Sequence, residues 1–91
     1  MTGSVLLQQA KVLIVEDDKS QSALELEILN SAEYQVSTVE SFQDAREMLN
    51  KKQFDVVILD YNLPDGKGDE LCRWVRQQEA MLLLPIIVVT G

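Results

Sequence analysis

The chain has 91 residues, enough for one domain with a single core, and a domain of this size buries about 60 to 65% of the surface that its unfolded chain exposes. Its 46% apolar and 25% charged residues are close to globular averages and indicate neither disorder nor a fibrous repeat. Proteins that bind nucleic acid carry basic surfaces that neutralise phosphates, whereas this chain has a formal charge of -7. We therefore expect no direct binding to nucleic acid.

Residue usage narrows the possible chemistry further. The single cysteine, Cys72, excludes an internal disulfide, and the absence of histidine removes the commonest zinc ligand and histidine-based catalysis. The longest apolar run, residues 80–84, is far shorter than the roughly 20 residues that cross a bilayer. With no signal-like N-terminus either, we expect a cytoplasmic protein without a membrane segment.

The first half of the chain predicts strand, helix, strand and helix after a lead-in of residues 1–10. Residues 11–15 (KVLIV) are mostly β-branched and apolar, which is typical of a strand buried on both faces. Apolar residues at helical spacing predict a helix over about residues 19–31, and the alternation of residues 34–39 (YQVSTV) predicts a more polar edge strand. Ser41 then begins a helix that extends to about residue 51.

The second half predicts strand, helix and strand. Residues 54–59 (FDVVIL) are typical of a second buried strand, which Asp60 terminates. Residues 61–68 (YNLPDGKG) contain proline and glycines, which indicate a loop. A third helix is predicted over about residues 69–79, and a last strand over residues 86–90.

This alternation of strands and helices predicts a parallel sheet with helices on both faces. Ligands of such sheets bind beyond the carboxyl ends of the strands. Glu16, Asp17 and Asp18 follow the first strand, Asp60 ends the third and Thr90 ends the fourth. If the first and third strands are neighbours, these side chains converge on one pocket.

A cluster of carboxylates without histidine or thiolate favours a hard divalent cation such as Mg²⁺. Two such charges about 4 Å apart repel by roughly 4 kcal/mol at an effective dielectric of 20, and a bound cation offsets that repulsion. There is a simpler alternative for each acid. Asp17 and Asp18 can cap the following helix, where negative charge favours the N-terminal dipole, and Asp60 can be a turn residue.

Three motifs together resemble the receiver domain of two-component response regulators over about residues 11–91. These motifs are VLIVEDD, VVILDYNLPDG and PIIVVTG, in the family's order and with similar spacing. The resemblance implies an α/β, flavodoxin-like, doubly wound parallel sheet with strand order 2-1-3-4. A complete receiver continues with another helix, a fifth strand and a last helix, so residues 11–91 are expected to form a C-terminally incomplete receiver domain after the lead-in.

The resemblance implies phosphorelay signalling rather than turnover of a substrate. Asp60 is similar to the phosphoacceptor, a carboxylate nucleophile that takes a phosphoryl group from a phosphohistidine on a sensor histidine kinase or phosphotransfer protein. Thr90 is similar to the switch hydroxyl that binds a phosphoryl oxygen. An output domain would follow in the full-length parent.

The resemblance also implies the ligands of Mg²⁺. Asp17 or Asp18 would hold the cation together with Asp60 and the backbone carbonyl of Asn62. Asp18 is the better candidate for direct ligation, with Asp17 acting partly through water, and Glu16 is a possible third acid. Phosphoryl transfer requires mainly in-line positioning and neutralisation of oxygens, which such a metal supplies.

The chain departs from the family pattern at its C-terminal end. The family's lysine and aromatic switch residue on the fifth strand are absent, and Lys67 does not occupy a matching position. An apolar edge at residues 86–90 predicts self-association of the chain by edge pairing or element exchange.

Two rival functions follow from these features. A pseudo-receiver that mediates dimerisation without phosphorylation is consistent with the missing lysine, whereas the intact acids argue against it. A haloacid-dehalogenase-like phosphatase also uses an aspartate nucleophile and Mg²⁺. That class places its nucleophile after the first strand in a DxD pattern, which EDDKS does not supply.

Overall fold

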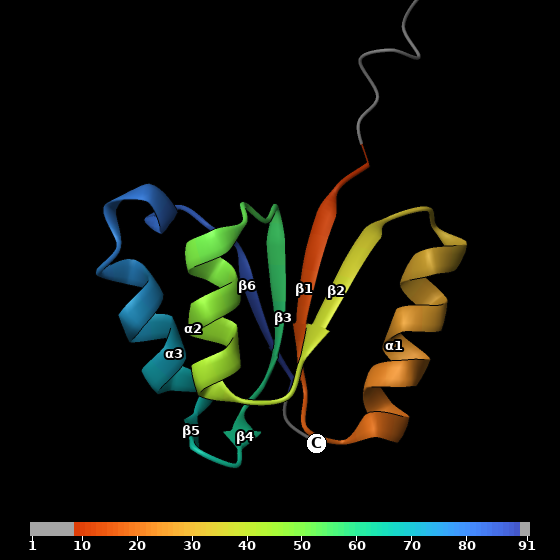
Figure 1. The fold of residues 1–91 in the computed structure, drawn as a ribbon, viewed down its shortest axis with the longest axis horizontal. Helices are drawn as coiled ribbons and strands as arrows, with labels where there is room; N and C mark the ends of the chain where they lie inside the picture. Colours follow the sequence, from red (N-terminus) through yellow and green to blue (C-terminus); the bar gives the residue numbers. More distant parts are fainter. Residues whose placement is uncertain (1–8, 90–91) are drawn as a thin grey trace, which may run out of the picture.

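The computed structural model describes residues 9–89. Four parallel strands form one sheet in the order β2-β1-β3-β6, and two short strands, β4 and β5, form a separate hairpin (Figure 1). In chain order the elements are β1 (Lys11–Val15), α1 (Lys19–Ser31), β2 (Gln35–Val39), α2 (Phe42–Lys51), β3 (Val56–Asp60), β4 (Asn62–Leu63), β5 (Gly66–Lys67), α3 (Gly68–Arg76), the 3₁₀ turn η2 (Glu79–Met81) and β6 (Ile86–Val89). The predicted 2-1-3-4 order is confirmed, with β6 as the fourth strand.

The helices lie on both faces of the sheet. Figure 1 shows α2 and α3 on one face and α1 alone on the other. Alternation along β1 explains this arrangement, because Leu13 and Val15 point to the face of α2 and α3 while Val12 and Ile14 point to the opposite face. All four side chains are buried, as the apolar sequence of this strand predicts.

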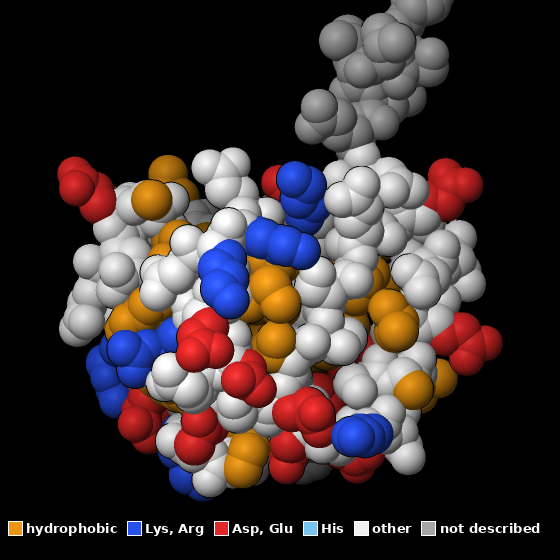
Figure 2. Space-filling model, in the orientation of Figure 1, with side chains coloured by type: hydrophobic (Ala, Val, Ile, Leu, Met, Phe, Trp, Pro, Cys, Tyr) orange, Lys and Arg blue, Asp and Glu red, His pale blue; other side chains and the backbone are white. Residues whose placement is uncertain are grey.

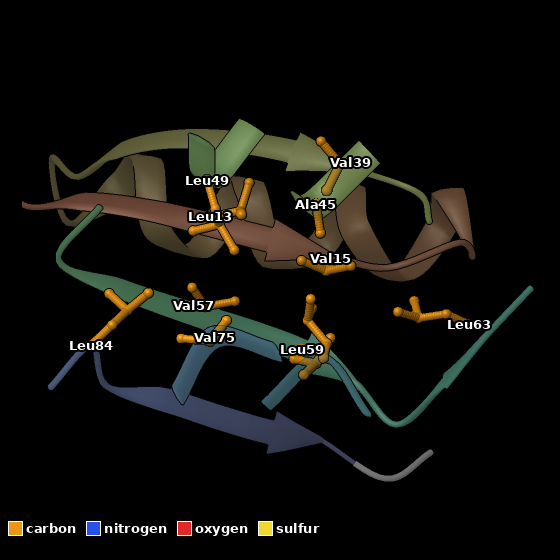
Figure 3. Packing of buried hydrophobic residues seen from close by; sticks show 11 residues of the cluster. Leu13, Val15, Val39, Ala45, Leu49, Val57, Leu59, Leu63, Val75 and Leu84 are labelled. Atoms are coloured by element: carbon orange, nitrogen blue, oxygen red, sulfur yellow. The ribbon is translucent and has the colours of Figure 1, made fainter. Parts of the chain in front are cut away.

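The main core lies between the sheet and the helices α2 and α3 (Figure 3). Each fully buried Leu or Val contributes roughly 1.5 to 3 kcal/mol relative to an exposed side chain. The buried cluster consists of Leu13, Val15, Val39, Ala45, Leu49, Val57, Leu59, Leu63, Leu71, Val75 and Leu84. This cluster holds β1 and β3 side by side and thereby fixes the carboxyl ends of both strands.

The structure differs from the predicted elements in the segment after β3. The predicted loop over residues 61–68 contains the β4–β5 hairpin, and α3 begins at Gly68 and ends at Arg76 instead of residue 79. The Arg76 guanidinium donates to the carbonyls of Met81 and Leu82 at 3.3 and 3.2 Å. These bonds turn the chain back after α3, so that Leu84 reaches the core before β6 begins.

The sheet face that carries α1 is open on the side of β6. Ile58 of β3 lies beside Ile87 of β6 in the register, and Ile87 is 55% exposed. α1 buries none of its residues fully, and its Leu24 and Ile28 are 53% and 60% exposed. Among the described residues β6 is an edge strand with apolar side chains in contact with solvent.

Candidate functional site

Three carboxylates meet at the carboxyl ends of β1 and β3. One oxygen each from Glu16, Asp17 and Asp60 lies within 4.8 Å of the others, and we refer to these three residues as the acidic cluster. The parallel register places Val15 beside Leu59, so that Glu16 and Asp60 follow at the same level of the sheet. The acidic cluster therefore results from strand pairing between residues more than 40 positions apart in the sequence.

The acidic cluster opens into a hollow of about 610 Å³. Its lining residues are Glu16, Asp17, Asp18, Gln21, Asp60, Asn62 and Val89. No lysine or arginine of residues 9–89 lines it. Figure 2 shows many acidic side chains toward the lower edge, where the strands end, with some basic side chains beside them, and a further group of basic side chains near the strand starts. Larger hollows near the strand starts lack such a set of convergent acids.

The electrostatics of the acidic cluster show uncompensated negative charge. Glu16 is only 8% exposed. Its burial and the nearby charges of Asp60 and Glu25 raise its pKa from 4.5 to about 7, although a hydrogen bond from the Asp18 N–H opposes this rise. Burial and then the charge of Asp60 also raise the pKa of Glu25, whose Oε1 has no hydrogen-bond partner among the described residues. A divalent cation would neutralise this charge, and the all-oxygen set suits Mg²⁺.

Asp18 has a different position from the acidic cluster. Its Oδ1 accepts hydrogen bonds from the backbone N–H groups of Ser20 at 2.9 Å and Gln21 at 3.1 Å, which makes Asp18 the N-cap of α1. This is the simpler of the two roles that the sequence leaves open for an acid at this position. The geometry therefore favours Glu16 over Asp18 as a metal ligand beside Asp17.

Asn62 lies directly beyond Asp60 in the β4–β5 hairpin. Its N–H donates to Asp60 Oδ1 at 3.3 Å. The ladder bond from the Gly68 N–H to the Tyr61 carbonyl, at 2.6 Å, makes Asn62 and Lys67 a non-hydrogen-bonded pair. In such a pair the N–H and the C=O of Asn62 both point away from β5. The Asn62 carbonyl therefore lies on the same edge of β4 as the N–H that donates to Asp60.

Gly68 permits this close approach of the hairpin to the end of β3. A Cβ atom on Gly68 would lie 3.0 Å from Tyr61 Cα and 3.3 Å from the Asp60 carbonyl oxygen. Any larger residue would push the start of α3 away from the segment that carries Asp60 and Asn62. Close backbone packing thus fixes the loop around the acidic cluster.

Comparison with known proteins identifies the family. The sequence profile of the response regulator receiver domain matches residues 12–91. The chain belongs to this family. Receiver domains act in two-component phosphorelay signalling and generally bind Mg²⁺ in an acidic pocket. In this chain an acidic cluster lies at the carboxyl ends of β1 and β3. No helix among residues 9–89 is long and apolar enough to span a membrane.

Individual relatives support the assignment to the receiver family. The transcriptional regulatory protein GltR of Pseudomonas aeruginosa is 37% identical over 80 residues, which cover 88% of this chain and 33% of GltR. The crystal structure of a receiver domain of a Syntrophus aciditrophicus histidine kinase has a TM-score of 0.86 at 32% identity, with 89% of this chain and 61% of that one covered. For the chemotaxis regulator CheY4 of Vibrio cholerae the TM-score is 0.87 at 34% identity, with coverage of 89% and 68%. The chain spans about a third of the length of curated relatives such as GltR.

Two residues of the hairpin next to the acidic cluster make contacts that sequence reasoning missed. The Asp65 carboxylate at the tip of the hairpin accepts hydrogen bonds from the N–H groups of Phe42 at 2.7 Å and Gln43 at 3.0 Å, at the start of α2. Lys67 Nζ donates to Asn62 Oδ1 at 2.8 Å. The turn composition of LPDG gives no signal that Asp65 pairs with residues more than 20 positions away. Thr90, the expected switch residue, lies outside the described residues.

Proposed function

We propose that this receiver domain accepts a phosphoryl group on Asp60 and that Mg²⁺ assists the transfer. The donor is a phosphohistidine on a sensor histidine kinase or phosphotransfer protein. The observation that carries the proposal is the convergence of Glu16, Asp17 and Asp60 in one hollow at the ends of two adjacent strands. The family assignment supports it, because phosphorelay signalling depends on such an acceptor carboxylate.

The acceptor chemistry requires one free oxygen on Asp60. Asp60 Oδ1 is engaged by the Asn62 N–H, which orients the carboxylate and leaves Oδ2 as the attacking atom. A bond forms between Oδ2 and phosphorus while the N–P bond of the donor breaks, and its electron pair returns to the imidazole nitrogen. The other ring nitrogen of the donor is protonated, so the imidazole leaves as a neutral histidine and the product is an acyl phosphate on Asp60.

The remaining residues of the acidic cluster would hold the cation. Glu16 and Asp17 provide carboxylate oxygens, and the Asn62 carbonyl lies on the edge of β4 that faces Asp60. A bound Mg²⁺ would neutralise the phosphoryl oxygens as charge develops on them. Without it, a phosphoryl dianion would enter a pocket in which burial and neighbouring acids already raise the pKa of Glu16 to about 7.

Thr90 and the parent protein extend the proposal beyond the described residues. We propose Thr90 as the hydroxyl that binds a phosphoryl oxygen and reports phosphorylation to an output domain. GltR and similar regulators are about three times as long as the matched segment. We therefore propose that a full-length parent carries an output domain that responds to phosphorylation of the receiver.

We also propose that β6 pairs with β6 of a second copy of the chain. The carbonyl of Pro85, just before β6, accepts from the Val57 N–H of β3, and the carbonyl of Val89 accepts from the N–H of Tyr61, just after β3. The N–H and C=O groups of Ile86 and Val88 therefore point away from the sheet, as in any edge strand. The exposed Ile87 side chain adds apolar contact area beside these groups. Such pairing is also what a pseudo-receiver that only dimerises would need.

Intact-protein mass spectrometry tests the acceptor function. The chain is incubated with acetyl phosphate with and without Mg²⁺, together with Asp60→Asn and, as a matched control, Asp69→Asn on the exposed side of α3. We expect one phosphoryl group, dependent on Mg²⁺, on the wild type and the control and none on Asp60→Asn. Equal labelling of Asp60→Asn would refute Asp60 as the acceptor, and no labelling of the wild type would favour the dimerisation module.

A further inference from the structure

Lys67 contacts two residues of the segment that follows Asp60. Its Nζ donates to Asn62 Oδ1 at 2.8 Å and lies 6.0 Å from the centroid of the Tyr61 ring. Lys67 is also the cross-strand neighbour of Asn62 in the β4–β5 hairpin. Because the Lys67 and Asn62 side chains are exposed, their hydrogen bond contributes little to global stability, and its effect is on the local geometry of the site.

The pairing of β4 with β5 decides which way the backbone of Asn62 points. The Gly68 N–H bond to the Tyr61 carbonyl flanks the Asn62–Lys67 pair, so the side chains of this pair are close while the backbone groups of Asn62 point outward. A slip of the hairpin by one residue would turn the Asn62 carbonyl to the other side. Two paired residues hold the register of β4 and β5 only weakly by themselves. The hydrogen bond from Lys67 Nζ to Asn62 Oδ1 stabilises this register.

We propose that Lys67 is a positioning residue for the acidic cluster. By holding Asn62 Oδ1, Lys67 keeps β4 in the register that presents the Asn62 carbonyl to a divalent cation. This inference rests on the proposed function, because it assumes that the acidic cluster binds such a cation. It adds a residue from β5 that does not touch the cation but determines how well the site is formed.

The charge of Lys67 acts in the opposite direction to its hydrogen bond. An ammonium near the acidic cluster repels a divalent cation, so removing the charge strengthens cation binding, while removing the bond weakens it. Variants of equal charge separate the two effects. Lys67→Met and Lys67→Gln are both neutral, but the glutamine amide can still donate to Asn62 Oδ1, because Cβ atoms of such a pair lie about 4.5 to 5.5 Å apart.

Binding of Mn²⁺ to the full chain, followed by the electron paramagnetic resonance signal of free Mn²⁺, tests this inference without any phosphotransfer. We expect the Kd of Lys67→Met to exceed that of Lys67→Gln by about two- to fivefold, which corresponds to roughly 0.4 to 1 kcal/mol. In an Asn62→Ala background the two variants should have the same Kd. Lys67→Arg, which keeps both the charge and the donor, should bind like the wild type.

The outcomes distinguish this inference from the proposed function. Equal Kd values for Lys67→Met and Lys67→Gln, with a wild type that binds Mn²⁺, overturn the positioning role alone. A difference that persists in the Asn62→Ala background also overturns it, because the effect then does not pass through Asn62. A wild type that does not bind Mn²⁺ overturns the metal site and this inference together. Circular dichroism melts of all variants verify that each one is folded.

Discussion

The contact between the hairpin tip and α2 provides a sharp test of the fold around the receiver site. Asp65 accepts hydrogen bonds from the N–H groups of Phe42 and Gln43, which have no intrahelical partners at the start of α2. The Oγ of Ser41, the N-cap, accepts a hydrogen bond from the Asp44 N–H at 3.1 Å. Asp65 thus acts as a second cap from a segment more than 20 residues away and ties the β4–β5 hairpin to α2.

Replacing Asp65 by alanine should destabilise the domain by about 1 to 1.5 kcal/mol. The loss of a capping aspartate costs roughly 0.5 to 2 kcal/mol, and the middle of this range applies because Asp65 serves two donors but is exposed to solvent. For a domain of this size that loss lowers Tm by about 4 to 12 °C. Asp65→Asn should lie between the wild type and Asp65→Ala, since it keeps an acceptor oxygen and loses the charge.

The effect of Asp65 should also depend on pH. Slight burial raises the pKa of Asp65, but hydrogen bonds from the backbone N–H groups of Gln43, Phe42 and Asp65 itself outweigh it and hold the pKa below its ordinary value of 3.8. The stabilisation is therefore fully present above the unfolded pKa and is lost as pH falls through the lower folded pKa. The gap in unfolding free energy between wild type and Asp65→Ala should be constant at neutral pH and shrink at pH below about 4.

Urea denaturation at several pH values measures this gap, with Asp69→Ala as a control that removes an exposed acid and its exposed ion pair with Arg73. We expect the control to stay within about 0.5 kcal/mol of the wild type. If Asp65→Ala matched the control at pH 7, Asp65 would not cap α2 and the tie between hairpin and helix would be refuted.

Three further predictions concern other parts of the chain. In the metal-free protein the pKa of Glu16 rises from 4.5 to about 7 on folding, so stability should fall as pH rises from about 5 to 8. Glu16→Gln should reduce this fall in urea titrations, and an unchanged fall would contradict the raised pKa. Glu33 has a φ of 65° at the C-terminal turn of α1, where glycine is favoured; Glu33→Gly should raise stability by about 1 kcal/mol, and a lower Tm would contradict this. If β6 pairs with a second copy, light scattering at tens of micromolar should show a dimer for the wild type and a monomer for Ile87→Lys; a monomeric wild type would rule the pairing out.

The sequence by itself determined the sheet and the general location of the site. The apolar run of residues 12–15 predicts a strand covered on both faces, as β1 is, whereas the equally apolar β6 is mostly exposed at the sheet edge. The β-α alternation then permits few topologies. Acids at the ends of β1 and β3 could be placed at one edge of the sheet for the same reason. These features depend on local composition and on chain order, which the sequence displays directly.

Only the tertiary structure decided which acids form the acidic cluster. Asp17 and Asp18 are adjacent in the sequence and chemically identical, yet Asp17 points into the acidic cluster while Asp18 caps α1, because the chain turns into the helix between them. The Asp65 cap of α2 and the Lys67 bond to Asn62 likewise depend on the two-residue strands β4 and β5, which are too short to have a sequence period. Packing of the whole domain sets the direction of a side chain at a turn and the contacts between turns. Local sequence patterns therefore do not predict them.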